Sequence, residues 1–259
     1  MSDQPSLVFD IETIPDLNGI RRLFSPLPTD DVQAIEHVLA LRRENNNSDM
    51  LPHYLQQIVT ISCVFRDSQQ LKVCSLGQEN DEESKLIKTF FAIIKCHEPN
   101  LISWNGGGFD LPVLHYRSLI HNIDASQYWE LGDENRDYRY NNYINRYHHR
   151  HIDLMDLLAR YQPRANAPLD ALAKLCGFPG KLGIDGSQVW ETFRLGKIAE
   201  IRAYCETDVM NTYLLYCRFQ KMRGLISADA YNQEIECVKN YLKDTSGEHW
   251  QEYLAKFNY

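Results

Sequence analysis

Two acidic residues near the start of the chain, Asp10 and Glu12, are spaced so that they could bind a metal ion together. They lie in the apolar run Leu7–Thr13, which has the composition of a β-strand. Residues two apart in a strand project from the same face, so both carboxylates point the same way. Adjacent carboxylates repel each other unless a cation lies between them, and their oxygens suit Mg²⁺ or Mn²⁺. The pair fits half of a metal site, although a solvated strand face would show the same spacing.

A further acid, Asp110, follows the apolar run Leu101–Asn105 and the three glycines Gly106–Gly108. Glycines allow the backbone to pass close to a neighbour or a ligand. Asp110 opens a helical pattern, so it fits either a site residue or a simple helix cap. The dinucleotide fingerprint and the phosphate-binding Gly-Lys-Ser/Thr ending are both missing, which disfavours a nucleotide cofactor.

The third piece is Tyr204 with Asp208, inside a helical pattern that continues through Phe219. Residues four apart share one face of a helix. A phenol beside a carboxylate can hold a water molecule while the carboxylate binds a metal. A buried tyrosine near a surface acid would give the same spacing, so this pair alone does not decide.

The order of the three pieces resembles the three motifs of the DEDD superfamily of 3′–5′ exonucleases. These are Asp-x-Glu on a first strand, Asn-x-x-x-Phe-Asp at a strand-to-helix junction, and Tyr-x-x-x-Asp on a late helix. The segment Phe9–Thr13 is similar to the proofreading domain of family-B DNA polymerases. The chain resembles, from residue 5 to about 220, the predicted exonucleases related to that domain but lacking a polymerase. Ala203 stands where the histidine branch has its histidine, so Tyr204 indicates the tyrosine (DEDDy) branch.

The resemblance implies an α/β fold with a ribonuclease-H-like mixed five-stranded sheet. Three antiparallel strands are continued by two parallel ones, with helices on both faces. It also implies two divalent metal ions, Mg²⁺ or Mn²⁺. The expected catalytic residues are Asp10, Glu12, Asp110, Tyr204 and Asp208, of which the four acids are the metal ligands. In this scheme Asp10 bridges both ions, Glu12 contacts the terminal 3′-hydroxyl, and Tyr204 orients the attacking water. The expected substrate contacts at the motifs are Ile11, Thr13, Asn105 and Phe109.

Composition predicts a compact cytoplasmic protein. The 259 residues are enough for one large α/β domain. No apolar run approaches the roughly 18 residues needed to span a bilayer, and the N-terminus lacks a signal-peptide pattern, so no membrane contact is expected. The seven cysteines include no Cys-x-x-Cys pair, which predicts reduced core residues rather than disulfides or a zinc site.

The net charge of −8 opposes a nucleic-acid partner, because phosphate binding is mostly electrostatic. Two divalent ions would halve that charge. Residues 136–164 also carry six arginines against three aspartates, with tyrosines and histidines between them. This mixture suits contact with a phosphate backbone and stacking with bases. We therefore predict that Arg139, Arg146 and Arg150 contact substrate, with a solvated polar loop as the alternative.

Periodicity places the motifs on regular elements. The expected strands after the first are 58–65, 71–76, 101–105 and 151–155. The expected helices are 81–96, 110–119, 168–177, 188–195 and 197–221, the last ending near Gly224. Asp153 and Asp156 are expected to cap or support rather than to bind metal.

Two segments lie outside this plan. Residues 16–57 form a long insertion, with a helix from Thr29, its expected N-cap, to Arg43, and then a polar tract at 44–49. We expect a mobile flap here. The tail from Ser227 predicts two amphipathic helices. The expected division is an exonuclease domain at 1–224 and a C-terminal helical extension at 225–259 packed on it.

The predicted activity is a metal-dependent 3′–5′ exonuclease that acts on single-stranded 3′ ends, on DNA rather than RNA, and releases nucleoside 5′-monophosphates. A catalytically inactive binding module of the same fold would be expected to have lost at least one acid, and none is missing. A metal-dependent phosphohydrolase would leave the Tyr-x-x-x-Asp helix unexplained. The assigned residues leave no room for a polymerase, so proofreading would act in trans, and a polymerase or repair partner is left open.

Overall fold

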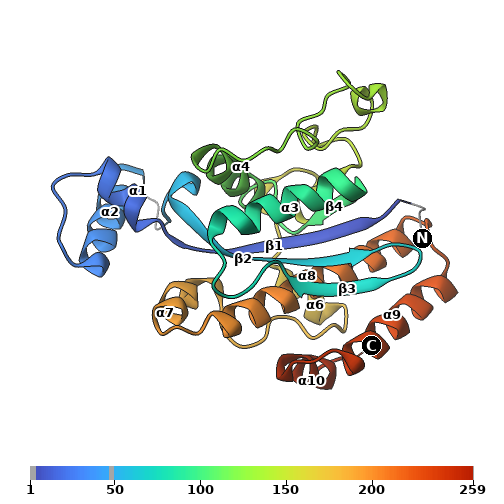
Figure 1. Ribbon diagram of the computed structural model, residues 1–259. Coiled ribbons are helices and arrows are strands. Elements are labelled where there is room, and N and C mark those ends of the chain that lie inside the picture. Colours follow the sequence, from blue (N-terminus) through green and yellow to red (C-terminus); the bar gives the residue numbers. More distant parts are fainter. Residues whose placement is uncertain (1–3, 47–49, 259) are drawn as a thin grey trace.

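The computed structural model describes residues 4–46 and 50–258, which are built around one five-stranded mixed sheet (Figure 1). Its strand order is β3-β2-β1-β4-β5. The strands are β1 (Ser6–Pro15), β2 (Gln56–Arg66), β3 (Leu71–Ser75), β4 (Asn100–Ser103) and β5 (His151–Asp153). β1, β2 and β3 pair antiparallel, whereas β1 with β4 and β4 with β5 pair parallel. The α/β class and the predicted strand arrangement are confirmed.

Helices cover both faces of the sheet (Figure 1). The α-helices are α1 (Leu17–Leu23), α2 (Asp31–Asn46), α3 (Glu83–His97), α4 (Asp110–Ile120), α5 (Leu154–Leu158), α6 (Leu169–Leu175), α7 (Val189–Arg194), α8 (Ile198–Met222), α9 (Ala228–Asp244) and α10 (Glu248–Ala255). Short 3₁₀ turns are η1 (His53–Leu55), η2 (Arg136–Arg139), η3 (Pro163–Ala165) and η4 (Gly186–Gln188). The predicted strand at 151–155 is wrong in its last two residues, because the Asp153 side chain accepts from the Asp156 N–H and starts α5 there.

Alternation along β1 decides which helix each side chain faces. Val8 packs in the apolar cluster shared with α8, α9 and α10. Leu7 and Phe9 pack instead in the cluster shared with α3 and α4. Because side chains alternate along a strand, Asp10 and Glu12 share the face of Val8 and point toward α8.

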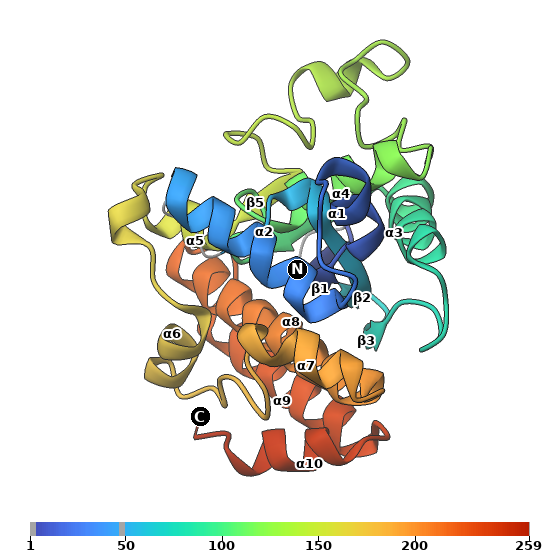
Figure 2. The same ribbon diagram turned by 90° about the vertical axis from the view of Figure 1, so that its left-hand side faces the viewer.

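The insertion at 16–57 stands beyond the end of the sheet (Figures 1 and 2). Its helices and η1 enclose a small core of their own, made by Ile20, Ile35, Val38, Leu51 and Leu55. The sequence pattern missed α1 and misplaced the cap of α2: Asp30, not Thr29, accepts the Gln33 N–H at 2.9 Å. Residues 47–49 of the polar tract lie outside the described residues, and the mobility of the insertion stays a prediction.

The tail forms the two helices that the pattern predicted, α9 and α10. Ser227 caps α9 by accepting the Ala230 N–H at 3.1 Å, and Gly224 ends α8 with φ of +73°. Tyr231 and Trp250 are buried in the cluster that α8 forms with the sheet. The domain boundary at 224 stays a prediction.

All seven cysteine thiols are free. Cys96 and Cys237 are exposed, so the predicted core position is wrong for these two. Within the described part of the chain, no helix is both long enough and apolar enough to cross a membrane. The cytoplasmic location stays a prediction.

Candidate active site

The first two acids lie where β1 runs past its neighbour β4. Parallel pairing between these strands covers only Ser6–Val8, and β4 ends at Ser103. On the other side, the register between β1 and β2 shifts between Glu12 and Thr13. Such bulges redirect side chains and often occur beside active sites. The stretch that carries Asp10 and Glu12 is therefore paired on one side only, and its other side is open to the loop that follows β4.

Asp110 uses that open side. It is the first residue of α4, and its Oδ1 accepts the backbone N–H of Ile11 at 3.0 Å. Its carboxylate therefore reaches β1 instead of capping its own helix. Gly106 permits the close packing of this loop on the end of β4, because a Cβ there would lie 2.5 Å from Ser103 Cβ. The Asp153 carboxylate holds the loop by accepting the N–H groups of Asn105 and Gly107 at 3.0 and 2.8 Å, which confirms the predicted supporting role.

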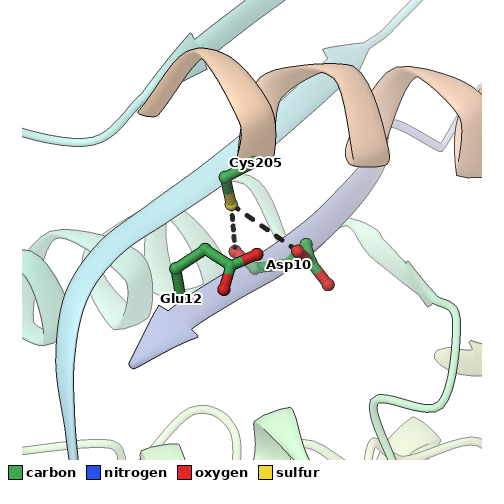
Figure 3. A group of neighbouring side chains, drawn as sticks. All are labelled: Asp10, Glu12 and Cys205. Carbon is green, nitrogen blue, oxygen red and sulfur yellow. Dashed lines mark hydrogen bonds between the residues drawn. The ribbon is translucent and has the colours of Figure 1, made fainter. Parts of the chain in front are cut away.

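The remaining acid comes from α8, which crosses the sheet. Tyr204 and Asp208 are both 4% exposed and share the helix face toward β1. Between them, Cys205 directs its thiol at Asp10, with the sulfur 3.6 Å from Oδ2 (Figure 3). The predicted acids of β1, α4 and α8 thus lie close enough to repel one another near the end of the central strand β1.

Lys181, which the motifs did not reveal, is the cation of this site. Its Nζ lies 3.1 Å from Asp208 Oδ2 and donates to the Tyr204 hydroxyl at 2.5 Å. Neighbouring Gly180 has φ of +75° and exchanges two hydrogen bonds with the Asn211 side chain, at 3.2 and 2.8 Å. Asn211 in turn accepts from the Tyr253 hydroxyl of α10 at 2.8 Å. The C-terminal extension therefore helps to fix the loop that presents Lys181.

Burial and mutual repulsion raise the pKa values of the acids. Burial first, and then Asp110 and Glu12, raise the pKa of Asp10. Burial and then Asp208 raise the pKa of Glu12. Burial raises the pKa of Asp110 to about 7 and also raises that of Asp208, against the opposing effect of Lys181. Asp208 Oδ1 is buried and has no hydrogen-bond partner among the described residues. One lysine does not neutralise this cluster.

The motif residues predicted to contact substrate have different environments. The Ile11 side chain is 3% exposed, and its N–H is already bound by Asp110. Thr13 donates to Gln56 Oε1 at 3.1 Å. Asn105 is exposed, and the half-buried Phe109 ring lies 5.6 Å from the His53 ring. Asn105 and Phe109 are therefore the better placed of the four for a substrate.

The three arginines of residues 136–164 that were predicted to contact substrate also differ in their environments. Arg150 is 8% exposed, its guanidinium lies 3.9 Å from the centre of the Tyr138 ring, and its Nε donates to the Asn141 carbonyl. This contradicts the predicted substrate contact, because Tyr138 and Tyr143 are folded inward and enclose the cation. Arg139 and Arg146 are exposed. For these two the substrate contact stays a prediction, and Arg146 is paired with Asp156 at 2.8 Å.

Comparison with known proteins identifies the family. Residues 48–257 match the family of predicted 3′-5′ exonucleases related to the exonuclease domain of PolB. The chain belongs to this family. The matched range contains Asp110, Tyr204 and Asp208 and begins after Asp10 and Glu12.

The chain is also similar to individual polymerases and exonucleases of greater length. The chain is similar to the catalytic polypeptide of DNA polymerase epsilon from Saccharomyces cerevisiae, with 29% identity over 155 residues, which are 56% of this chain and 6% of that one. It thus spans a small part of that relative. The family-B DNA polymerase of Pyrobaculum calidifontis shares the fold at a TM-score of 0.51 and 15% identity, over 82% of this chain and 24% of that one. Escherichia coli exonuclease I, in complex with a dA16 oligonucleotide, gives a TM-score of 0.39 and 13% identity, over 87% of this chain and 46% of that one.

Members of such a family depend on divalent metal, and the side chains fit one. One ligand atom from each of Asp10, Glu12 and Cys205 lies within 4.8 Å of the others. The unpartnered Asp208 Oδ1 supplies a further buried oxygen. Carboxylate oxygens are the ligands that Mg²⁺ and Mn²⁺ prefer, so the donor set agrees with the family.

A cavity of about 910 Å³ adjoins the loop before Asp110. Asn105 and Gly107 line it at one side, and Arg146, Tyr147 and Tyr161 line it at another. Tyr147 is 68% exposed. The cavity therefore connects the second motif with the exposed, basic and aromatic part of the loop.

Proposed function

We propose that this chain is a metal-dependent 3′–5′ exonuclease of the tyrosine branch. It hydrolyses phosphodiester bonds at single-stranded 3′ ends and releases nucleoside 5′-monophosphates. The observation that carries the proposal is a group of four mutually interacting carboxylates from three separate elements. One lysine lies beside them, and one of their buried oxygens has no hydrogen-bond partner among the described residues. Buried charges are normally paired, so this excess of negative charge points to bound cations.

In this proposal the four acids, Asp10, Glu12, Asp110 and Asp208, hold two divalent ions. When bound, such ions help a nucleophile to approach an anionic phosphodiester and stabilise the leaving oxygen. Tyr204 positions the attacking water through its hydroxyl, which the Lys181 ammonium and the Asp208 carboxylate orient. Lys181 also limits the repulsion within the site before metal binds.

The substrate is proposed to be DNA rather than RNA, because the family is related to the exonuclease domain of PolB. Asn105 and Phe109 would contact the terminal nucleotides. The incoming strand would pass along the cavity, where Tyr147 offers a stacking surface and Arg146 a charge. A polymerase or repair complex is the partner that such an activity suits.

The decisive assay uses single-stranded DNA and RNA of the same sequence, labelled at the 5′ end, with Mg²⁺, Mn²⁺ or EDTA. We expect a ladder that shortens from the 3′ end, mononucleotide products, and no cleavage in EDTA. Asp10→Asn, purified in parallel, controls for a contaminating nuclease. Strand binding without any cleavage would instead identify an inactive binding module, and hydrolysis of p-nitrophenyl phosphate alone would identify a phosphohydrolase.

A further inference from the structure

The thiol of Cys205 lies inside the proposed metal site (Figure 3). Its sulfur is 3.6 Å from the Asp10 backbone oxygen and 3.6 Å from Asp10 Oδ2. The Glu12 carboxylate lies beside the same pair, with ligand atoms of the three residues within 4.8 Å of one another. Within residues 4–46 and 50–258, this is the one group of three or more histidine, cysteine, aspartate or glutamate side chains whose ligand atoms all lie that close.

Sulfur changes which ions such a site accepts. Carboxylates alone select hard ions such as Mg²⁺ and Mn²⁺, whereas thiolates select Zn²⁺ and other soft ions. For tetrahedral zinc, bonds of roughly 2.3 Å to sulfur and roughly 2.0 Å to oxygen place those two atoms about 3.5 Å apart. The observed separation of 3.6 Å between Cys205 Sγ and Asp10 Oδ2 is close to this expected sulfur–oxygen distance.

A further buried donor lies on the same helix. Asp208 is three residues from Cys205 along α8, so the two side chains are neighbours on its surface. Asp208 is 4% exposed, and its Oδ1 has no hydrogen-bond partner among the described residues. Asp208 lies outside the group whose ligand atoms are within 4.8 Å of one another. Two oxygens from β1 and one sulfur would therefore hold the ion, and Asp208 would reach it as a fourth ligand only after its side chain turns.

We propose that the site also binds thiophilic divalent ions, Zn²⁺ and Cd²⁺, through Cys205 Sγ together with Asp10 and Glu12, and that such an ion switches the nuclease off. The thiol proton passes to solvent as the metal–sulfur bond forms, and no electron is transferred. An ion held in this way occupies the oxygens that Mg²⁺ requires. The inhibition rests on the proposed function, whereas the binding does not.

The binding test uses metal-free protein in which the exposed Cys96 and Cys237 are replaced by serine. Cd²⁺ is titrated while ultraviolet thiolate-to-metal absorption and heat are recorded. We expect one equivalent to bind with a charge-transfer band, and Cys205→Ser to lose the band and at least about tenfold in affinity, since even residues that only support a metal ligand cost 10–100-fold when changed. Cys217→Ser is the matched control, because that buried thiol lies about 18 Å further along α8 and should bind Cd²⁺ like the parent.

The activity test measures the Zn²⁺ concentration that halves the Mg²⁺-supported rate of each protein, relative to its own uninhibited rate. This Zn²⁺ concentration should rise at least tenfold in Cys205→Ser. If Cys205→Ser has a lowered melting temperature, Cys205→Ala is measured in its place and should show the same rise. An unchanged band and affinity in the Cys205 variants would overturn the proposed ligand. A lost band with unchanged zinc sensitivity would overturn the switch. If the parent shows no nuclease activity, the proposed function is wrong. The Cd²⁺ titration then still tests the proposed metal ligand, because it does not depend on activity.

Discussion

Two clusters of buried charge lie at the same end of the sheet, and they are built in opposite ways. The paired cluster consists of Asp16, Glu83, Arg117 and His121. Arg117 donates to both carboxylates, and His121 also contacts Glu83. The carboxylate cluster consists of Asp10, Glu12, Asp110 and Asp208, with Lys181 at its rim. In the paired cluster, one arginine forms ion pairs with two carboxylates. In the carboxylate cluster, one lysine lies beside four carboxylates.

The difference separates a structural role from a functional one. In the paired cluster, Glu83 also accepts the Ile58 N–H at 2.7 Å, so the network joins α3, α4 and the start of β2 to the end of β1. In the carboxylate cluster, burial raises the pKa of Asp208, and its Oδ1 has no hydrogen-bond partner within residues 4–46 and 50–258. An unpaired buried charge costs stability. The proposed divalent ions would offset this cost at the end of β1.

Changing an acid of the carboxylate cluster should have the largest effect on activity. Asp10→Asn or Asp208→Asn should lower the rate by about 10³ or more, because a metal clamp contributes several kcal/mol to the transition state. The melting temperature in EDTA should stay the same or rise, because repulsion is removed. Cleavage rates and thermal melts of both variants check this. Substantial remaining activity in either variant would remove that acid from the proposed ligand set.

Tyr204→Phe should come next. The hydroxyl lies between Lys181 and Asp208 and the ring is buried, so deleting one oxygen should spare the packing. Positioned groups of this kind contribute about 10²–10⁴ in rate. We expect a lower kcat with nearly unchanged KM. Tyr213→Phe is the matched control: it is buried on the same helix, and its hydroxyl bonds Glu234, so it should cost stability and leave kcat unchanged. Similar kinetics in the two variants would make Tyr204 a packing residue.

Changing the paired cluster should lower the stability of the fold. Arg117→Met removes a cation that is 3% exposed and leaves two buried carboxylates without their partner. Breaking a buried pair in this way costs about 3–5 kcal/mol. Urea unfolding should show this loss as a lower midpoint with an unchanged slope. A loss under about 1 kcal/mol would mean that His121 and water replace the arginine, and that the two clusters differ less than their geometry implies.

Local pattern predicted most of the strands and helices, whereas the arrangement of the sheet and the grouping of the four acids were predicted from the resemblance to the exonuclease family. The strands alternate and α8 has a helical period. Of the three aspartates, Asp110 stands at a strand-to-helix junction, whereas Asp10 lies within β1 and Asp208 within α8. Lys181 could not be placed in this way, since its contact with Asp208 depends on how the loop after α6 docks on α8. Its position between Gly180 and Gly183 was the available signal.

The Arg150 error has the same origin. Sequence shows tyrosines between arginines, but not that Tyr138 and Tyr143 face inward and enclose Arg150. Whether a basic side chain faces solvent is decided by packing between segments. The insertion illustrates the same limit, because α1 is held by the small core that it shares with α2 and η1 rather than by a strong local signal.

The carboxylate cluster should also make stability depend on pH. The pKa of Asp110 is about 7 in the folded chain, against an ordinary value of 3.8. Its contribution to folding is therefore complete below about pH 4 and is lost as pH rises through 7. In EDTA, Asp110→Asn should gain stability relative to the parent between pH 5 and pH 8, and Mg²⁺ should reverse the gain. The low pKa values of His115 and His151, about 4, cancel in this difference. A constant difference between the two proteins would show that Asp110 is charged throughout.

The smallest effect should come from the exposed arginines of the loop, which neither cluster includes. Replacing Arg139 and Arg146 with alanine removes one charge that lines the cavity proposed for the strand, that of Arg146, and one exposed charge elsewhere in the same loop. Single-strand affinity should fall, and the slope of log affinity against log salt should flatten by up to ~0.7 for each lost phosphate contact. The rate at saturation should change little, because neither residue approaches the acids. Lys72→Ala with Lys88→Ala is the control of equal charge, since both lysines are exposed and β3, which carries Lys72, is at the far edge of the sheet. If both double variants flatten the slope equally, the effect comes from total charge and the strand does not follow this loop.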